Sequence, residues 1–252
     1  MTRLWDLVRN TFRETIRDRV LYVILVFAFV MIGASTLFGT LTVGQDRKII
    51  LDLGLAAIEL FGVAIAVFVG TNLLFKEIDK RTVYVVLTKP IPRSVFLLGK
   101  FFGLALTLGL LLVLMGGAYL ALASVKGAYS PALLGAIALI GLQLLVVVAL
   151  TLFFSTFASP IMSMVFTTCL YFIGHNTEAL RALAQKASPL QKAAVEALYY
   201  VLPNLSTFDA KNMVVYGDAV SAGRWLWAIG YAAAYVCALL ATASALFERK
   251  EF

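Results

Sequence analysis

Long apolar runs separated by short charged segments follow one another along the chain, beginning near residue 20. Several runs reach the roughly 20 residues that an α-helix needs to cross the ~30 Å hydrocarbon core of a bilayer. The pattern predicts an all-α, polytopic membrane protein in which residues 1–252 form a single transmembrane domain. Six spans are expected, the fifth of them short: 20–41, 51–75, 101–125, 132–154, 158–174 and 225–247.

Residues 1–19 have an amphipathic pattern instead. An apolar side chain recurs at every fourth position from Leu4 to Ile16, beside a stripe of arginines from Arg9 to Arg17. Such a stripe is typical of a helix that lies in the membrane interface. The alternative is that these residues continue the first span as one helix.

The composition leaves little room for a separate soluble domain. Of the 252 residues, 62% are hydrophobic and 14% are charged, whereas about a quarter of a typical soluble domain is charged. The formal net charge is +7, and most basic residues lie beside the spans. This placement favours attraction to anionic membrane lipid over binding of nucleic acid.

The distribution of Lys and Arg indicates the orientation, because basic residues concentrate in cytoplasmic segments. With the N-terminus inside, the inner segments hold 13 of the 21 basic residues, and the longer outer segments hold 8. We therefore expect both termini in the cytoplasm. Residues 176–223 are then extracytoplasmic and are predicted to form short amphipathic helices before the last span.

Glu59 is the most notable ionisable residue inside a predicted span. Ionisable groups at such depth are costly and usually face the protein interior or water. Glu59 either lines the outer part of a substrate path, together with Gln143 of the fourth span, or holds a polar contact across a dimer. The alternative is a purely structural role, in which Glu59 is protonated or bonded to another span. His175, at the outer end of the fifth span, is interpreted as an interfacial polar residue.

Small residues spaced four apart let membrane helices approach closely. They occur from Gly62 to Gly70 in the second span and from Gly230 to Thr242 in the sixth. These faces predict helix packing within the chain, with a dimer seam as the alternative.

No motif places chemistry on this chain. The nearest match to a nucleotide-binding P-loop, residues 94–101, lacks the first glycine and the final hydroxyl residue. Neither HExxH nor GxSxG occurs. One histidine with Cys169 and Cys237 cannot alone form a Cys/His metal site, and both cysteines are expected to be small buried side chains without a disulfide. We therefore expect no enzymatic activity, metal or cofactor on this chain.

The charged segment 76–100, KEIDKRTVYVVLTKPIPRSVFLLGK, separates the second and third spans. It combines six Lys and Arg residues with a short apolar centre and two prolines. Charges around a hydrophobic centre, where two spans leave the membrane, are typical of a docking element for a soluble partner. The residues expected to make this contact are Glu77, Asp79, Arg81, Thr82, Val83, Tyr84, Val85, Val86, Leu87, Lys89, Pro90 and Arg93.

Several pieces of the chain together match a known pattern. They are Glu77, Arg81-Thr82, Leu87, Lys89-Pro90, Arg93 and Gly99-Lys100, with Leu202-Pro203-Asn204 and the terminal Phe247-Glu248-Arg249-Lys250. The chain resembles the permease subunits of type-two ABC exporters, in the single-domain bacterial branch that includes copper-enzyme maturation and gliding-motility permeases. Members often carry glycine where this chain has Arg81.

The resemblance implies a permease subunit that couples ATP hydrolysis on a separate ATPase to export of a substrate. It implies two ABC ATPase subunits, which carry the ATP and Mg, and a second permease chain, giving a homodimer. Segment 76–100 would be the cytoplasmic coupling helix, and the location would be the bacterial inner (cytoplasmic) membrane. Lipid, polysaccharide, peptide, drug and metal-related substrates are all compatible with the sequence.

Three alternatives are also compatible with parts of the pattern. A non-transporting ABC membrane subunit would transmit force to an extracytoplasmic partner through the same docking segment. An intramembrane enzyme would need a paired catalytic base, which the serines lack. A secondary transporter would need two related halves with broken helices near the midplane.

Overall fold

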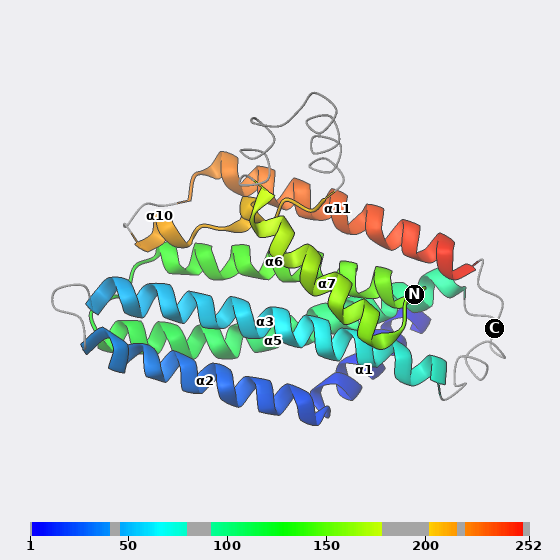
Figure 1. Ribbon diagram of the computed structural model, residues 1–252, viewed down its shortest axis with the longest axis horizontal. Helices are drawn as coiled ribbons and strands as arrows, with labels where there is room; N and C mark the ends of the chain where they lie inside the picture. Colours follow the sequence, from blue (N-terminus) through cyan, green and yellow to red (C-terminus); the bar gives the residue numbers. More distant parts are fainter. Residues whose placement is uncertain (1, 41–45, 80–91, 178–201, 216–219, 249–252) are drawn as a thin grey trace.

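The computed structural model describes residues 2–40, 46–79, 92–177, 202–215 and 220–248. Within these ranges every regular element is a helix, which confirms the predicted all-α fold (Figure 1). The elements are α1 (Thr2–Ile16), α2 (Arg19–Thr40), α3 (Asp46–Asp79), α5 (Arg93–Val125), α6 (Ala132–Ser155), α7 (Pro160–His175), the 3-10 helix η1 (Leu205–Phe208), α10 (Lys211–Val215) and α11 (Ala222–Glu248).

Among the described residues, five helices are long and apolar enough to cross a membrane: α2, α3, α5, α6 and α11. The predicted fifth span corresponds to α7, an apolar helix of 16 residues. Two helices extend beyond the predicted boundaries, because α3 begins at Asp46 and ends at Asp79 and α5 begins at Arg93. Much of segment 76–100 is therefore a continuation of the two flanking helices.

Helices α3 and α6 form the centre of the bundle. In each, 67% of the most apolar stretch is buried, compared with 22% in α2 and 17% in α11. Close contact between α3 and α6 depends on glycine, because a Cβ at Gly62 would lie 2.7 Å from Leu144 and one at Gly70 would lie 3.1 Å from Thr151. The small-residue series in the second span thus serves packing within the chain.

Helix α11 presents small residues on its exposed face. A Cβ at Gly230 would have no neighbour within 4 Å among the described residues, and Ala234 and Ala238 are exposed. The expectation that both cysteines are buried is wrong, since Cys169 on α7 and Cys237 on α11 are exposed and free. A thiol is small and only weakly polar, so a surface facing lipid accommodates it as well as a core does.

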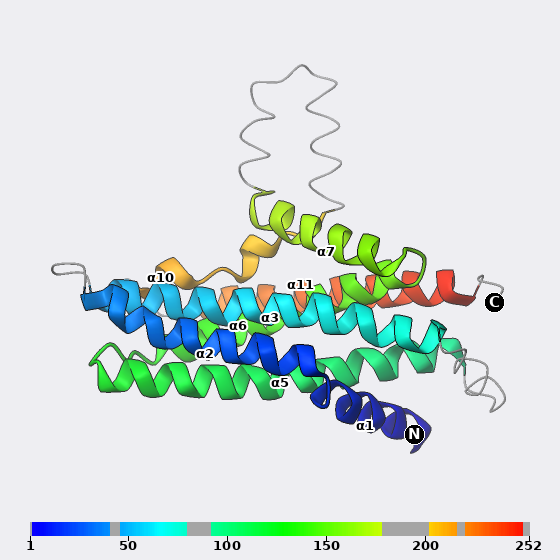
Figure 2. The ribbon, with the colours of Figure 1, turned by 60° about the horizontal axis from the view of Figure 1, so that its bottom comes forward.

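Helix α1 is separate from α2, so the alternative of one continuous helix is wrong. The backbone N–H of Arg17 donates to the Glu14 carbonyl at 3.2 Å, which tightens the end of α1. Asp18 then caps α2, because its Oδ1 accepts a hydrogen bond from the Val20 N–H at 3.0 Å. Figure 2 shows α1 diverging from the bundle at the end where α3 finishes and α5 begins.

Candidate functional site

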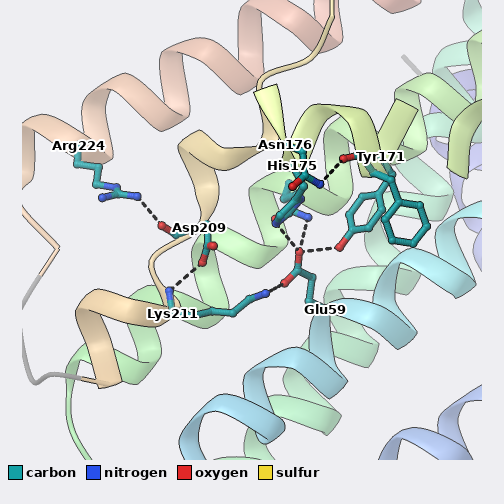
Figure 3. A network of polar contacts seen from close by, with 9 residues as sticks. Glu59, Tyr171, His175, Asn176, Asp209, Lys211 and Arg224 are labelled. Atoms are coloured by element: carbon teal, nitrogen blue, oxygen red, sulfur yellow. Dashed lines mark hydrogen bonds and ion pairs between the residues drawn. The ribbon is translucent and has the colours of Figure 1, made fainter. Parts of the chain in front are cut away.

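Glu59 lies well inside α3 and is almost completely buried, with 2% of its surface exposed. Its side chain is surrounded by polar groups from other elements, as Figure 3 shows. Gln143 Nε2 donates a hydrogen bond to Glu59 Oε1 at 2.8 Å, and the Tyr171 hydroxyl donates to the same oxygen at 2.8 Å. The sequence therefore singled out two residues, Glu59 and Gln143, that the fold brings into direct contact.

Two cationic or ionisable side chains complete the surroundings of Glu59. His175 Nε2 lies 3.2 Å from Glu59 Oε1, and Lys211 Nζ forms an ion pair with Glu59 Oε2. His175 is the last residue of α7 and is partly exposed, with a side chain that is 20% accessible, so its interpretation as an interfacial polar residue stays a prediction, and its contact with Glu59 is an addition to it. We call Glu59, Gln143, Tyr171, His175 and Lys211 the Glu59 cluster.

Helical spacing explains how α7 contributes two members of the cluster. Tyr171 and His175 are four residues apart, which places them on one face of a helix, and their rings lie 5.2 Å apart between centroids. Ser163 and Thr167 continue this face and are buried. The face begins near Ser155 of α6, whose hydroxyl lies 2.9 Å from that of Ser163.

Lys211 is positioned by the turn that opens α10. Asp209 Oδ1 accepts a hydrogen bond from the Lys211 N–H at 3.1 Å, which fixes the first residue of this short helix. The Arg224 guanidinium donates to the Asp209 carbonyl oxygen (Figure 3). It also lies 2.8 Å from Met213 Sδ. Arg224 therefore ties the turn to the beginning of α11, and Lys211 reaches inward from an anchored backbone.

The contacts of the Glu59 cluster hold several helices together. A buried carboxylate must be paired and hydrogen-bonded to offset its loss of hydration, and Glu59 has donors from α6, α7 and α10. His175 Nε2 faces Glu59 Oε1, and His175 Nδ1 has no hydrogen-bond partner within the described ranges. In the part of the chain that the structure describes, no group of three or more His, Cys, Asp or Glu could hold a metal ion.

Only part of this cluster could be recognised from the sequence. From the sequence, Lys211 is only one of the basic residues in a predicted outer segment. The residues around it do not indicate that the chain returns to α3 at that point. Tyr171 had no signal by itself. Thr167, Tyr171 and His175 are spaced four residues apart in an otherwise apolar helix. This pattern could have identified Tyr171 and His175 as members of one polar face.

A second polar region joins α1 and its junction with α2 to the ends of α5 and α3. Lys76 Nζ, near the end of α3, forms a salt bridge of 2.8 Å with Asp18 Oδ2. Lys100 Nζ on α5 lies 3.6 Å from Glu14 Oε2 and 5.6 Å from the ring centroid of Phe96.

The environment of Asp18 alters its titration. Burial by itself raises the pKa of its carboxyl group. The hydrogen bond and positive charge of Lys76, with the hydrogen bond from the Val20 N–H, outweigh burial, and the pKa falls below its usual value. The carboxylate form, which pairs with Lys76, is therefore favoured in the folded protein.

These two salt bridges flank the segment predicted to dock a partner. Glu77 and Asp79 belong to the last turn of α3, and Arg93 is the first residue of α5. The other predicted contact residues, Arg81, Thr82, Val83, Tyr84, Val85, Val86, Leu87, Lys89 and Pro90, lie outside the described residues. Their role as a contact surface stays a prediction.

One comparison with known proteins identifies the family. The family model described as "ABC-2 family transporter protein" matches residues 5–252. The chain belongs to the ABC-2 transporter family. It is a multi-pass membrane protein and a permease subunit of an ABC transporter, and no curated protein sequence matches it.

Membership of the ABC-2 family also bears on partners. A permease of this family is a membrane subunit that is typically not catalytic itself, and it implies an ABC ATPase as partner. The resemblance predicted from the residues around segment 76–100 is thereby confirmed at the level of the family.

Proposed function

We propose that this ABC-2 permease couples ATP hydrolysis on separate ATPase subunits to export of a substrate across the bacterial inner membrane. Two ATPase subunits, which bind the ATP and Mg, dock beneath a homodimer of this chain, and both termini face the cytoplasm. The match to the ABC-2 family over residues 5–252 carries this proposal. Residues 80–91, which join the ends of α3 and α5, supply the ATPase contact.

Helix α3 is the proposed lever. It comprises 34 residues, so at 1.5 Å per residue it is about 50 Å long, and Glu59 lies within it. ATP-driven closure of the ATPases displaces the cytoplasmic ends of α3 and α5. Shear between packed helices is a common way for such a displacement to spread.

Glu59 and Gln143 are proposed to act in this movement. Both are buried, Glu59 at 2% and Gln143 at 1% exposure, and they bond to each other. Displacement of α3 changes the distance between Glu59 and its donors on α6, α7 and α10. The proposed path for substrate then opens beside these residues as the contacts with α7 and α10 separate.

The first experiment tests the ATPase contact. Val85→Asp, Val86→Asp and Leu87→Asp are each expected to lower co-purification of the ATPase while membrane insertion is unchanged. Val125→Asp is a matched control, because Val125 is 84% exposed at the opposite end of α5. Undiminished ATPase recovery with all three substitutions would contradict the proposed contact.

The second experiment tests the role of Glu59. Glu59→Gln keeps the shape of the side chain but removes the charge that pairs with Lys211. Transport is expected to change while ATPase binding is retained. Wild-type transport in this variant would assign Glu59 a purely structural role.

A force-transmitting subunit without transport is the second candidate function. The contact of Lys211 with Glu59 supports it, because this contact links the segment before the last span to the proposed lever. This candidate predicts that an extracytoplasmic protein is recovered with residues 176–223 in an ATP-dependent manner and that no substrate crosses. Substrate translocation by the purified complex in proteoliposomes favours export instead.

A further inference from the structure

An apolar groove runs between α1 and α5 on the outside of the bundle. Its volume is about 350 Å³, within the range of small-molecule sites. The two helices approach each other closely beside this groove, where Gly103 of α5 lies against Thr11 of α1. The lining residues are Trp5, Val8, Arg9, Phe12, Leu106 and Leu110.

The groove opens on the outer face of α5, a helix that is long and apolar enough to cross the membrane. Leu106 and Leu110 are 47% and 41% exposed on α5, and Trp5 of α1 is 64% exposed. Apolar side chains exposed on a span face lipid, and tryptophan favours the depth of the lipid headgroups. A groove with apolar walls at this depth is filled by a lipid acyl chain in preference to water.

Arg9 gives the groove a positive charge. It is exposed, and no ion pair of its guanidinium occurs among the described residues. Two acidic groups on this side of the bundle are already engaged, since Glu14 pairs with Lys100 and Asp18 with Lys76. Asp6, about one turn before Arg9 on α1, is exposed, and no ion pair joins the two among the residues that the structure describes. An arginine at the edge of an apolar site can keep its stem among apolar groups while its guanidinium meets a phosphate.

We propose that this groove binds one anionic phospholipid of the leaflet on the α1 side. One acyl chain lies between α1 and α5, and the headgroup phosphate contacts Arg9. The occupant of the groove is thus a lipid with a net negative headgroup. This inference depends on the chain being a membrane protein and is independent of ATPase coupling and export.

Quenching of Trp5 fluorescence by brominated lipid tests the proposal. Trp225→Phe and Trp227→Phe leave Trp5 as the only tryptophan of the chain. The full-length protein is reconstituted in zwitterionic vesicles that contain a small fraction of brominated phosphatidylglycerol or, separately, brominated phosphatidylcholine. We expect phosphatidylglycerol to associate roughly fivefold more strongly, from the usual effect of one basic residue near a lipid surface.

Matched variants separate a specific site from general surface charge. Arg9→Gln is expected to remove the preference for the anionic lipid. Arg13→Gln removes the same charge one turn away and is expected to retain the preference for the anionic lipid. Arg13 lies outside the groove, beside Asn10 and Arg17. Leu106→Phe narrows the groove and is expected to lower quenching by both lipids.

Two results would overturn the proposal. One is equal quenching by the two brominated lipids in the protein with Arg9. The other is an equal loss of preference in Arg9→Gln and Arg13→Gln, which would mean that the lipid responds to the overall charge of α1. A chromatographic profile like that of the parent protein establishes that each variant is folded.

Discussion

Two of the polar contacts that hold helix α3 differ in their surroundings. Near its middle, Glu59 is 2% exposed and contacts groups from three other helices. Near its end, Lys76 has a side chain that is 48% exposed and pairs with Asp18. Burial strengthens electrostatic interactions and makes an unpaired group costly, whereas water and salt weaken an exposed pair.

The difference suggests a division of roles along α3. The Glu59 cluster fixes how α3, α6, α7 and α10 are arranged. The pair of Lys76 with Asp18 joins the junction between α1 and α2 to the part of α3 next to the proposed ATPase contact, and it can open at little energetic cost. We therefore expect the end of α3 to move more easily than its middle.

The largest effect is expected for Lys211→Met. This change leaves the Glu59 carboxylate buried without its ion-pair partner, and removal of one partner of a buried pair typically costs about 3–5 kcal/mol. The thermal unfolding midpoint of the detergent-solubilised protein should fall clearly. The double variant Glu59→Gln with Lys211→Met should recover much of the loss, and an unchanged midpoint in Lys211→Met would contradict a stabilising ion pair.

Gly103→Ala should disturb the attachment of α1. A Cβ at this position would lie 2.4 Å from Thr11 Cγ2 and 3.1 Å from the Val8 carbonyl oxygen, and such overpacking typically costs about 1–3 kcal/mol. Faster hydrogen exchange in α1 is the expected result. Gly109→Ala is the control within the same helix, because its Cβ would have no neighbour within 4 Å in the part of the chain that the structure describes. Equal exchange in both variants would argue against tight α1 packing.

Tyr171→Phe should have a smaller effect on the same cluster. It removes one hydrogen bond to Glu59 Oε1, and interhelical hydrogen bonds in membrane proteins contribute about 0.6 kcal/mol on average. The unfolding midpoint should fall slightly, with no change for Tyr22→Phe, because Tyr22 is 50% exposed on α2. If Tyr171→Phe lowered the unfolding midpoint as much as Lys211→Met does, the charged contact of Glu59 would not be stronger than its neutral hydrogen bond.

The smallest effect is expected for Asp18→Asn, which removes the charge that pairs with Lys76. An exposed ion pair contributes about 0.2–1 kcal/mol and is weakened by salt. Because the folded state lowers the pKa of Asp18 from 3.8, its contribution is present above pH 3.8 and is lost as the pH falls toward the lowered pKa. Hydrogen exchange at the α1–α2 junction should rise in low salt and converge with the parent protein at high salt; a difference that persists at high salt would indicate a buried contact.

The sequence predicted the helical bundle well because membrane spans are defined by local composition. The apolar runs correspond to α2, α3, α5, α6, α7 and α11. Charge was a poorer guide to where helices end, since Lys76 and Lys100 belong to helices that continue past the predicted membrane boundary. Lysine stems can lie along apolar surface, so a basic residue need not mark a helix end.

The candidate site was only half predictable. Glu59 and Gln143 stood out because polar groups are rare in spans, and they proved to be partners. Lys211 and Tyr171 could not be assigned, because their contact with Glu59 depends on how distant segments return to α3. The exposure of Cys169 and Cys237 could not be predicted from the sequence either, because the same small side chain suits both a lipid-facing surface and a protein interior.

Labelling from the two sides of the membrane tests the proposed coupling most directly. In a background with Cys169→Ala and Cys237→Ala, a cysteine replacing Lys89 is expected to react with a membrane-impermeant thiol reagent only from the cytoplasmic side. Added ATPase subunit should protect it. Labelling of this position from the opposite side of the membrane would contradict both the orientation and the ATPase contact.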